Sequence, residues 1–202
     1  MTIFYRYGGG LYVNVTNRCP CDCVFCIRQN GESVGDADSL WLEHEPGVEE
    51  IISDFEKADK EGCSEVVFCG YGEPLERLDT VLEVCKFIRR NSDLKIRINT
   101  NGLSDLINGR PTAWLLEGLV DTVSISLNAS NAKEYVRLTR PVYGEKAFEA
   151  MLNFARDCKN YVPNVVLTVV DVIPEEEIEA CRRLAREMGI PLRVRAYEGK
   201  NS

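Results

Sequence analysis

Strand-like and helix-like segments alternate along almost the whole chain. Short apolar runs are followed by segments whose apolar residues recur at helical spacing. Such alternation builds a parallel sheet covered by helices, either as an open doubly wound sheet or as a barrel. The expected strands are 11–16, 65–69, 95–99, 122–127, 165–172 and 192–197, and the expected helices are 46–58, a face from 75 to 88, 112–119, 146–158 and 175–188.

Polar residues recur on one face of several of these strands. Arg97 and Asn99 alternate with isoleucines, and Ser124 and Ser126 alternate with Val123 and other apolar residues. Parallel strands covered on both faces are apolar throughout, so one face of this sheet is expected to lack helices. Six strands cannot close an eight-stranded ring. The sequence therefore predicts an α/β fold, a partial (β/α)6 TIM-type barrel of parallel strands with a polar lumen, as a single domain over residues 1–202.

Composition and charge narrow the class of protein further. The 202 residues are 45% hydrophobic, which argues against disorder, and no apolar stretch approaches the ~20 residues of a membrane span. A net charge of −8 opposes binding to nucleic acid or an anionic membrane. The N-terminal residues lack the pattern of a signal peptide, so we expect a cytoplasmic protein with neither a membrane nor a nucleic acid as its partner.

Cysteines are the compositional outlier, and four of the nine follow the first expected strand. Cys19, Cys23 and Cys26 have the spacing C-x3-C-x2-C, which lets three soft thiolates converge on one centre. Structural zinc takes four ligands, whereas a 4Fe–4S cluster held by three cysteines leaves one iron open to a small molecule. Cys21 is either a bystander or the fourth ligand of a non-catalytic iron–sulfur or zinc module. Small buried hydrophobes are expected at Cys63, Cys69, Cys85, Cys158 and Cys181.

The three-cysteine pattern also carries a family resemblance. With the aromatic Phe25 before the last cysteine, it resembles the signature of the radical S-adenosylmethionine (radical SAM) superfamily, whose fold is the partial (β/α)6 barrel. The resemblance implies that S-adenosylmethionine (SAM) binds the open iron, and that its reductive cleavage gives a 5′-deoxyadenosyl radical that abstracts a hydrogen atom from a substrate. It also implies sensitivity to oxygen and an electron donor such as flavodoxin or ferredoxin.

Motifs after the other strands receive roles toward SAM from the same resemblance. Residues 69–74 resemble the Gly-Gly-Glu-Pro element that binds the amino group of SAM, with Tyr71 inserted between the glycines. The fourth strand resembles the one that holds the ribose, and either Arg137 or Arg140 is expected at the SAM carboxylate. The residues expected to contact SAM are Phe25, Gly70, Gly72, Glu73, Asn99, Thr100, Asn101, Ser126, Asn128 and one or both of Arg137 and Arg140.

The last strand and an acidic loop bear on the substrate. Arg195 and Tyr197 share one strand face, which either lines the lumen and meets a small anionic metabolite or is the solvated face of an edge strand. The acidic stretch from Glu32 to Glu45 is expected to be a solvated loop, or a lid over the cluster. The substrate is a protein if the chain resembles a glycyl-radical activase.

Two short elements suggest a subgroup of the superfamily. The Tyr-Arg-Tyr-Gly-Gly-Gly run at 5–10 and the Ser-Leu-Asn-Ala element at 126–129 are most similar to small radical SAM proteins associated with TatD-family nucleases. That similarity implies a functional link to such a nuclease, and it names no substrate.

Overall fold

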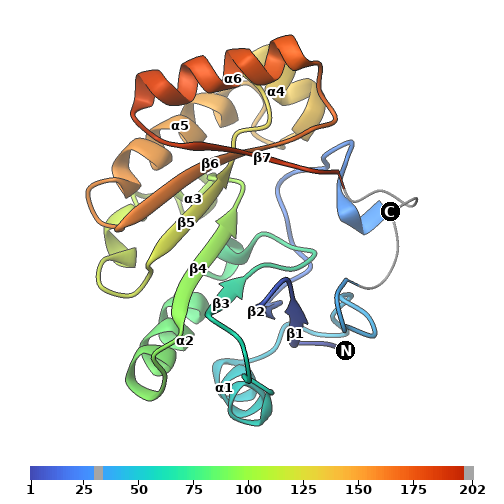
Figure 1. Cartoon of the computed structure of the whole chain (residues 1–202), viewed down its shortest axis with the longest axis vertical. Helices are drawn as coiled ribbons and strands as arrows, with labels where there is room; N and C mark the ends of the chain where they lie inside the picture. Colours follow the sequence, from blue (N-terminus) through green and yellow to red (C-terminus); the bar gives the residue numbers. More distant parts are fainter. Residues whose placement is uncertain (30–33, 198–202) are drawn as a thin grey trace.

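One seven-stranded sheet runs through the protein in the order β1 to β7, in a computed structural model that describes residues 1–29 and 34–197 (Figure 1). The strands are β1 (Phe4–Tyr7), β2 (Gly10–Val13), β3 (Glu65–Phe68), β4 (Lys95–Thr100), β5 (Thr122–Ser126), β6 (Asn164–Val170) and β7 (Leu192–Arg195). The α-helices are α1 (Val48–Lys57), α2 (Leu78–Asn91), α3 (Ser104–Asn108), α4 (Ala132–Thr139), α5 (Lys146–Cys158) and α6 (Glu175–Met188). Short 3-10 helices are η1 (Ile27–Gln29), η2 (Pro74–Arg77) and η3 (Ala113–Leu116).

The six predicted strands all form, as the parallel strands β2 to β7. The helices lie along one side of the curved sheet, from α1 and α2 near its first strands to α5 and α6 beside β6 and β7 (Figure 1). Val66 and Ile98 are fully buried on that side, whereas Arg97 and Asn99 occupy the alternate, partly exposed positions. The sheet ends at β1 and β7 without joining them, so the predicted partial barrel in a single domain is confirmed. Among the described residues, no helix has the length and apolarity needed to span a bilayer.

The N-terminal hairpin is an addition that the sequence analysis missed. β1 pairs antiparallel with β2, and the register from Phe4↔Val13 to Tyr7↔Gly10 leaves Gly8 and Gly9 as a two-residue turn. Both glycines have positive φ, +54° and +82°, as a tight type I′ hairpin turn requires. In the sequence, the pair Gly8-Gly9 between two strand-like segments was the signal that could have predicted this hairpin. The hairpin forms one wall of the lumen.

Helices α3 and α4 were also missed, and the expected helix at 112–119 is only the short η3. The start of α4 is capped by Asn131, whose side-chain oxygen accepts a hydrogen bond from the backbone N–H of Glu134 at 3.1 Å. The helix ends at Arg140, which adopts a left-handed conformation with φ +44°. This ending leaves the last carbonyl groups of α4 available to other parts of the chain.

Candidate functional site

The cysteine-bearing loop is fastened to the end of α4. The backbone N–H of Asp22 donates to the carbonyl of Thr139 at 3.0 Å, and that of Val24 donates to the carbonyl of Leu138 at 2.9 Å. These are the unpaired carbonyls of a helix C-terminus, so the loop satisfies them while the helix fixes the loop. A residue in the left-handed region at Arg140 stops the helix at the point where the carbonyls meet the loop.

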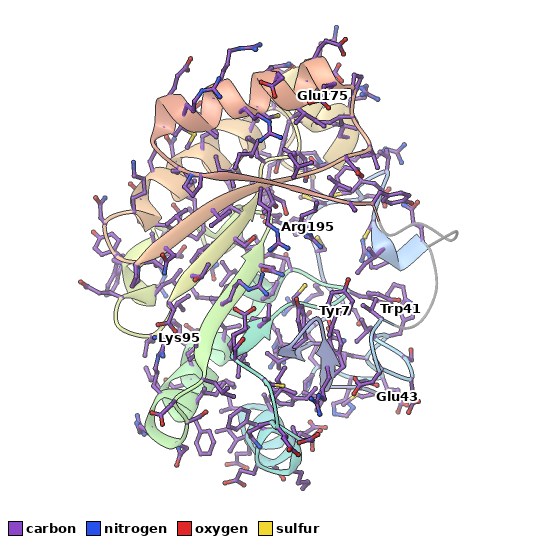
Figure 2. All side chains as sticks on the ribbon, in the orientation of Figure 1. Tyr7, Trp41, Glu43, Lys95, Glu175 and Arg195 are labelled. Atoms are coloured by element: carbon purple, nitrogen blue, oxygen red, sulfur yellow. The ribbon has the colours of Figure 1, made fainter. Side chains whose placement is uncertain are left out.

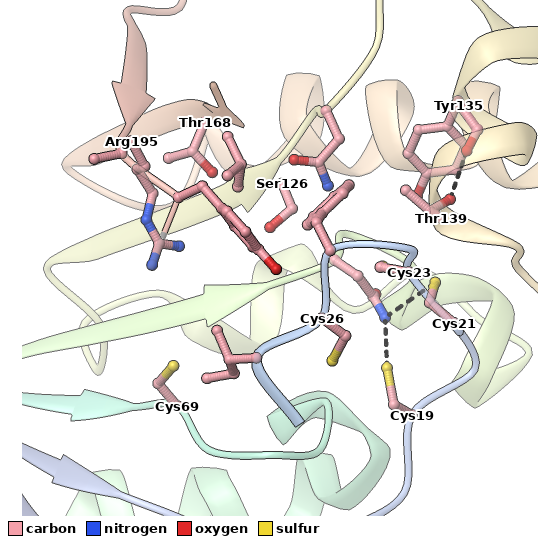
Figure 3. A pocket seen from close by; sticks show the side chains of 17 residues that line it. Cys19, Cys21, Cys23, Cys26, Cys69, Ser126, Tyr135, Thr139, Thr168 and Arg195 are labelled. Carbon is pink, nitrogen blue, oxygen red and sulfur yellow. Dashed lines mark hydrogen bonds between the residues drawn. The ribbon is translucent and has the colours of Figure 1, made fainter. Parts of the chain in front are cut away.

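The four clustered cysteines line one cavity of about 200 Å³ (Figure 3). Cys19, Cys23 and Cys26 are half-buried, so their thiols are both placed by the loop and open to the cavity. The side-chain amide of Asn101 reaches the sulfur atoms of Cys19 at 3.9 Å and Cys21 at 3.8 Å. Three soft donors opening on one cavity fit an iron–sulfur cluster with a free coordination position.

Cys21 lies between two of the predicted ligands. Its thiol hydrogen-bonds with those of Cys19 and Cys23, and these contacts raise the pKa of Cys21, while its hydrogen bond to Cys19 lowers the pKa of Cys19. Cys21 is 5% exposed and packs in the main core, as a small hydrophobe would. Across the described residues, no group of three His, Cys, Asp or Glu side chains is arranged to hold a single metal ion.

Glu73 is a buried carboxylate that ties three segments together. Its oxygens accept hydrogen bonds from the hydroxyl of Thr100 at 2.7 Å, from the backbone N–H of Asn101 at 2.7 Å and from that of Leu75 at 3.1 Å. Burial raises the pKa of Glu73 to about 8 despite these donors. The carboxylate thus fixes the loop after β3 to the loop after β4, and Thr100 acts through Glu73 rather than at the cavity wall.

The two predicted glycines allow the loop after β3 to touch the cysteine loop. A Cβ at Gly72 would collide with the carbonyl oxygens of Thr16 and Arg18, and one at Gly70 would collide with the side chain of Asn14. The backbone N–H of Glu73 also donates to the carbonyl of Arg18 at 2.8 Å. Glycine is required at Gly72 because only a residue without a side chain permits backbone to approach backbone this closely, and at Gly70 it leaves room for the side chain of Asn14.

Ser126 reaches the cysteine-lined cavity (Figure 3), and Asn128 also lines it. Asn128 takes φ +58°, a left-handed conformation that asparagine tolerates, as the chain leaves β5. Phe25 and Asn101 also line this cavity. Asn99 does not, because it faces a second cavity beside the thiol of Cys69. The wall residues that the sequence analysis did not assign to the site are Ile27, Cys69, Tyr135, Thr139, Thr168, Val170 and Ala196.

The two candidate arginines for the SAM carboxylate lie elsewhere. Arg137 pairs with Glu134 one helical turn away, with a nitrogen–oxygen distance of 2.8 Å, and the side chain of Arg140 lies 3.5 Å from Asp22. Both side chains are largely exposed, and neither lines the cysteine cavity. The structure therefore does not bring either guanidinium to the site, and Arg140 serves instead to end α4.

A second, polar cavity of about 460 Å³ adjoins the first at Thr168, Arg195 and Ala196. Arg195 extends from the end of β7 towards the hairpin that carries Tyr7 (Figure 2). Arg195 lines both cavities on the lumen side of β7, and Tyr197 lines the cysteine cavity. The wall of the polar cavity consists of Tyr7, Gly8, Tyr12, Glu65, Arg97, Asn99, Ser124, Thr168, Arg193, Val194, Arg195 and Ala196.

The described part of the acidic loop, residues 34–45, is anchored and lines neither cavity. The carboxylate of Glu45 accepts from Arg18 at 2.7 Å and also lies 3.6 Å from Arg77. None of the described residues 34–45 lines either cavity, so the predicted lid is not seen there, while Glu32 lies outside the described residues. The ion pair between Glu45 and Arg18 instead holds the start of the cysteine loop in place.

Comparison with known proteins agrees with this geometry. The Radical SAM superfamily model matches residues 13–188. Molybdenum cofactor biosynthesis protein 1 of Dictyostelium discoideum is 25% identical over 96% of the chain, and a GTP 3′,8-cyclase of Corynebacterium glutamicum is 32% identical over 68%. The chain spans only 29% and 35% of the lengths of these two relatives. The structure of Streptococcus suis SuiB bound to S-adenosylmethionine superposes on 95% of the chain, and 39% of SuiB is covered, with a TM-score of 0.66 at 16% identity.

The chain belongs to the radical SAM superfamily. The predicted cofactors, a 4Fe–4S cluster and SAM, are those of the family, and the prediction of a radical SAM enzyme is confirmed at that level. The reaction of a single relative cannot be assigned to this chain. The matched relatives are much longer, and the structural likeness at 16% identity concerns the fold alone.

Proposed function

We propose that this chain is a radical SAM enzyme that holds a 4Fe–4S cluster through Cys19, Cys23 and Cys26 and binds SAM in the cysteine-lined cavity. The observation that carries the proposal is the opening of these three half-buried thiols on one cavity, at the ends of parallel strands where such folds bind ligands. When bound, these cofactors supply an electron and a 5′-deoxyadenosyl radical that removes a hydrogen atom from the substrate.

The chain itself supplies placement and shielding. Asn101 donates toward the cysteine sulfurs, while Gly70 and Gly72, which do not line the cavity, let the loop after β3 pack closely against Asn14 and the start of the cysteine loop. Ser126 and Asn128 offer donors and acceptors to the ribose hydroxyls. Phe25 and Tyr135 provide apolar walls that keep water from the reacting atoms. In this proposal Glu73 acts from behind the wall by holding the two adjacent loops in place.

Electron paramagnetic resonance (EPR) of the anaerobically reconstituted, dithionite-reduced protein tests this proposal without a substrate. We expect a reduced 4Fe–4S signal whose g-values move when SAM is added. Ser126→Ala should weaken SAM binding several-fold by removing a hydrogen bond, whereas Ser124→Ala, on the same strand face but in the polar cavity, should not. A signal that SAM leaves unmoved, or zinc in place of iron, would instead favour the four-cysteine module that includes Cys21.

The identity of the partners stays a prediction of the sequence. A flavodoxin or ferredoxin as reductant and sensitivity to oxygen follow from the proposed chemistry, and the cytoplasmic location stays a prediction from the sequence alone. The subgroup associated with TatD-family nucleases rests on the sequence elements alone. A protein substrate, as for a glycyl-radical activase, is supported by one feature: the lumen is open between β1 and β7. Isolation of a stable complex with a protein that carries a glycyl-radical loop would test that alternative.

A further inference from the structure

We propose that the polar cavity binds the oxyanion group of the substrate, a carboxylate or a phosphate, through Arg193 and Arg195. This inference rests on the proposed function and adds the substrate class to it. Three guanidinium groups and one carboxylate line the cavity, so two positive charges remain in a protein whose net charge is −8. A positively charged cavity in an acidic chain concentrates and orients anions.

The three arginines differ in what they already bind. Arg97 is paired with Glu65 through two hydrogen bonds of 2.6 and 3.1 Å, and it also donates to the hydroxyl of Tyr12 at 3.4 Å. Arg193 and Arg195 have no carboxylate within ion-pair distance among the described residues. Both are exposed on the lumen face of β7, two residues apart on one strand face. Their donors are therefore available to a ligand.

The position of Arg195 links the anion site to the chemistry. Arg195, Thr168 and Ala196 line both cavities, whereas Arg193 lines only the polar one. An anion held by the two arginines would extend from the polar cavity toward the cysteine-lined cavity. Tyr7 and Tyr12 of the hairpin, whose rings meet edge to face with centroids 5.5 Å apart, form the opposite wall. The site thus offers two cations on one side and an aromatic surface on the other.

Protection of the edge of the sheet is the competing explanation for charges on β7. Charges that protect an edge strand discourage another strand from pairing with it and do not require a cavity. Here both guanidinium groups belong to a cavity wall, and that wall adjoins the cysteine site. The bidentate match between a guanidinium group and a carboxylate or phosphate further favours anion recognition.

Arginine footprinting on the reconstituted full chain with SAM tests the site directly. Phenylglyoxal labelling is followed by peptide mass spectrometry in inorganic phosphate, in succinate, and in sodium chloride at the same ionic strength. We expect phosphate or succinate to slow labelling of Arg193 and Arg195 at least threefold and saturably. Arg183, which is exposed on α6, should label at the same rate in all three salts. In Arg193→Gln the protection of Arg195 should disappear, whereas in Arg183→Gln it should persist.

Each outcome decides a different point. Stronger protection by phosphate identifies a phosphate ester as the substrate class, and stronger protection by succinate identifies a carboxylate. Equal labelling of Arg193 in all three salts, or protection of Arg183 to the same degree, would overturn the inference. The EPR response to SAM on the same preparation tests the proposed function separately. A normal SAM response without protection rejects only the anion site, whereas protection without a SAM response rejects only the proposed binding of SAM at the cluster.

Discussion

Two cavities share the concave face of one sheet, and their walls are chemically opposite. The first is lined by the four clustered cysteines and by largely buried side chains such as Tyr135 and Thr139. The second is lined by three arginines, a glutamate and hydroxyl groups. The first suits soft metal ligands and exclusion of water, and the second suits a charged, hydrated ligand. In our proposal the cofactor and the substrate therefore occupy separate cavities that meet at Arg195.

Loss of any one cysteine ligand should abolish assembly of the cluster in the cysteine cavity. Replacement of Cys19, Cys23 or Cys26 by Ala removes one of three thiolates, so we expect iron and sulfide to be lost almost completely after reconstitution. Cys21→Ala removes a thiol buried in the core and should leave the iron content unchanged. Iron and sulfide analysis with EPR of the four variants is the measurement. Equal loss in Cys21→Ala would show that the site uses four cysteines.

The two cavities also differ in how far the sequence predicts them. The cysteine cavity draws its main residues from short motifs: spacing indicated the cysteines of 19–26, and the family resemblance indicated Asn101, Ser126 and Asn128. The polar cavity combines Tyr7, Glu65 and Arg193, which only the sheet brings together. Periodicity predicted the six parallel strands, but the hairpin depended on a turn signal, and the positions of Arg137 and Arg140 depended on how α4 ends.

Gly72 tests whether close backbone approach is needed at the cysteine cavity. In Gly72→Ala the new Cβ would meet two backbone carbonyl oxygens, which cannot move aside as a flexible side chain can. We expect a loss of about 3 kcal/mol in the free energy of unfolding, together with weaker SAM binding. Gly47→Ala is the matched control, because nothing lies within 4 Å of its Cβ and its φ is −69°. Urea denaturation of the reduced apoprotein measures the unfolding free energy of both variants. Equal losses would show that the close backbone contact at Gly72 does not contribute to stability.

Glu73, which lies behind the wall of the cysteine cavity, should make the stability of the protein depend on pH. Its pKa in the folded protein is about 8, above the ordinary value of 4.5, so the folded state retains a proton that the unfolded state releases. Stability therefore falls as the pH rises from about 5 towards 8, by about 2 kcal/mol between pH 5 and 7. Glu73→Gln removes this titration. The unfolding free energy of the variant minus that of the wild type should therefore increase as the pH rises. Urea denaturation at pH 5, 6 and 7 measures this, and a constant difference would contradict the raised pKa.

Substitutions at Arg97 and Arg193 distinguish an arginine that stabilises the fold from one that is available to a ligand. Both line the polar cavity, where we expect the smallest changes in unfolding free energy. The Arg97 side chain is 16% exposed and that of its partner Glu65 is 29% exposed, so Arg97→Met leaves a half-buried carboxylate without its partner. We expect a cost of about 1 kcal/mol in unfolding free energy, most of it recovered when Glu65→Gln is added. Arg193→Met has no ion pair to break among the described residues and should stay within about 0.5 kcal/mol of wild type. Equal costs for the two variants would mean that Arg193 is already bound within the fold, and its guanidinium would then not be available to a substrate.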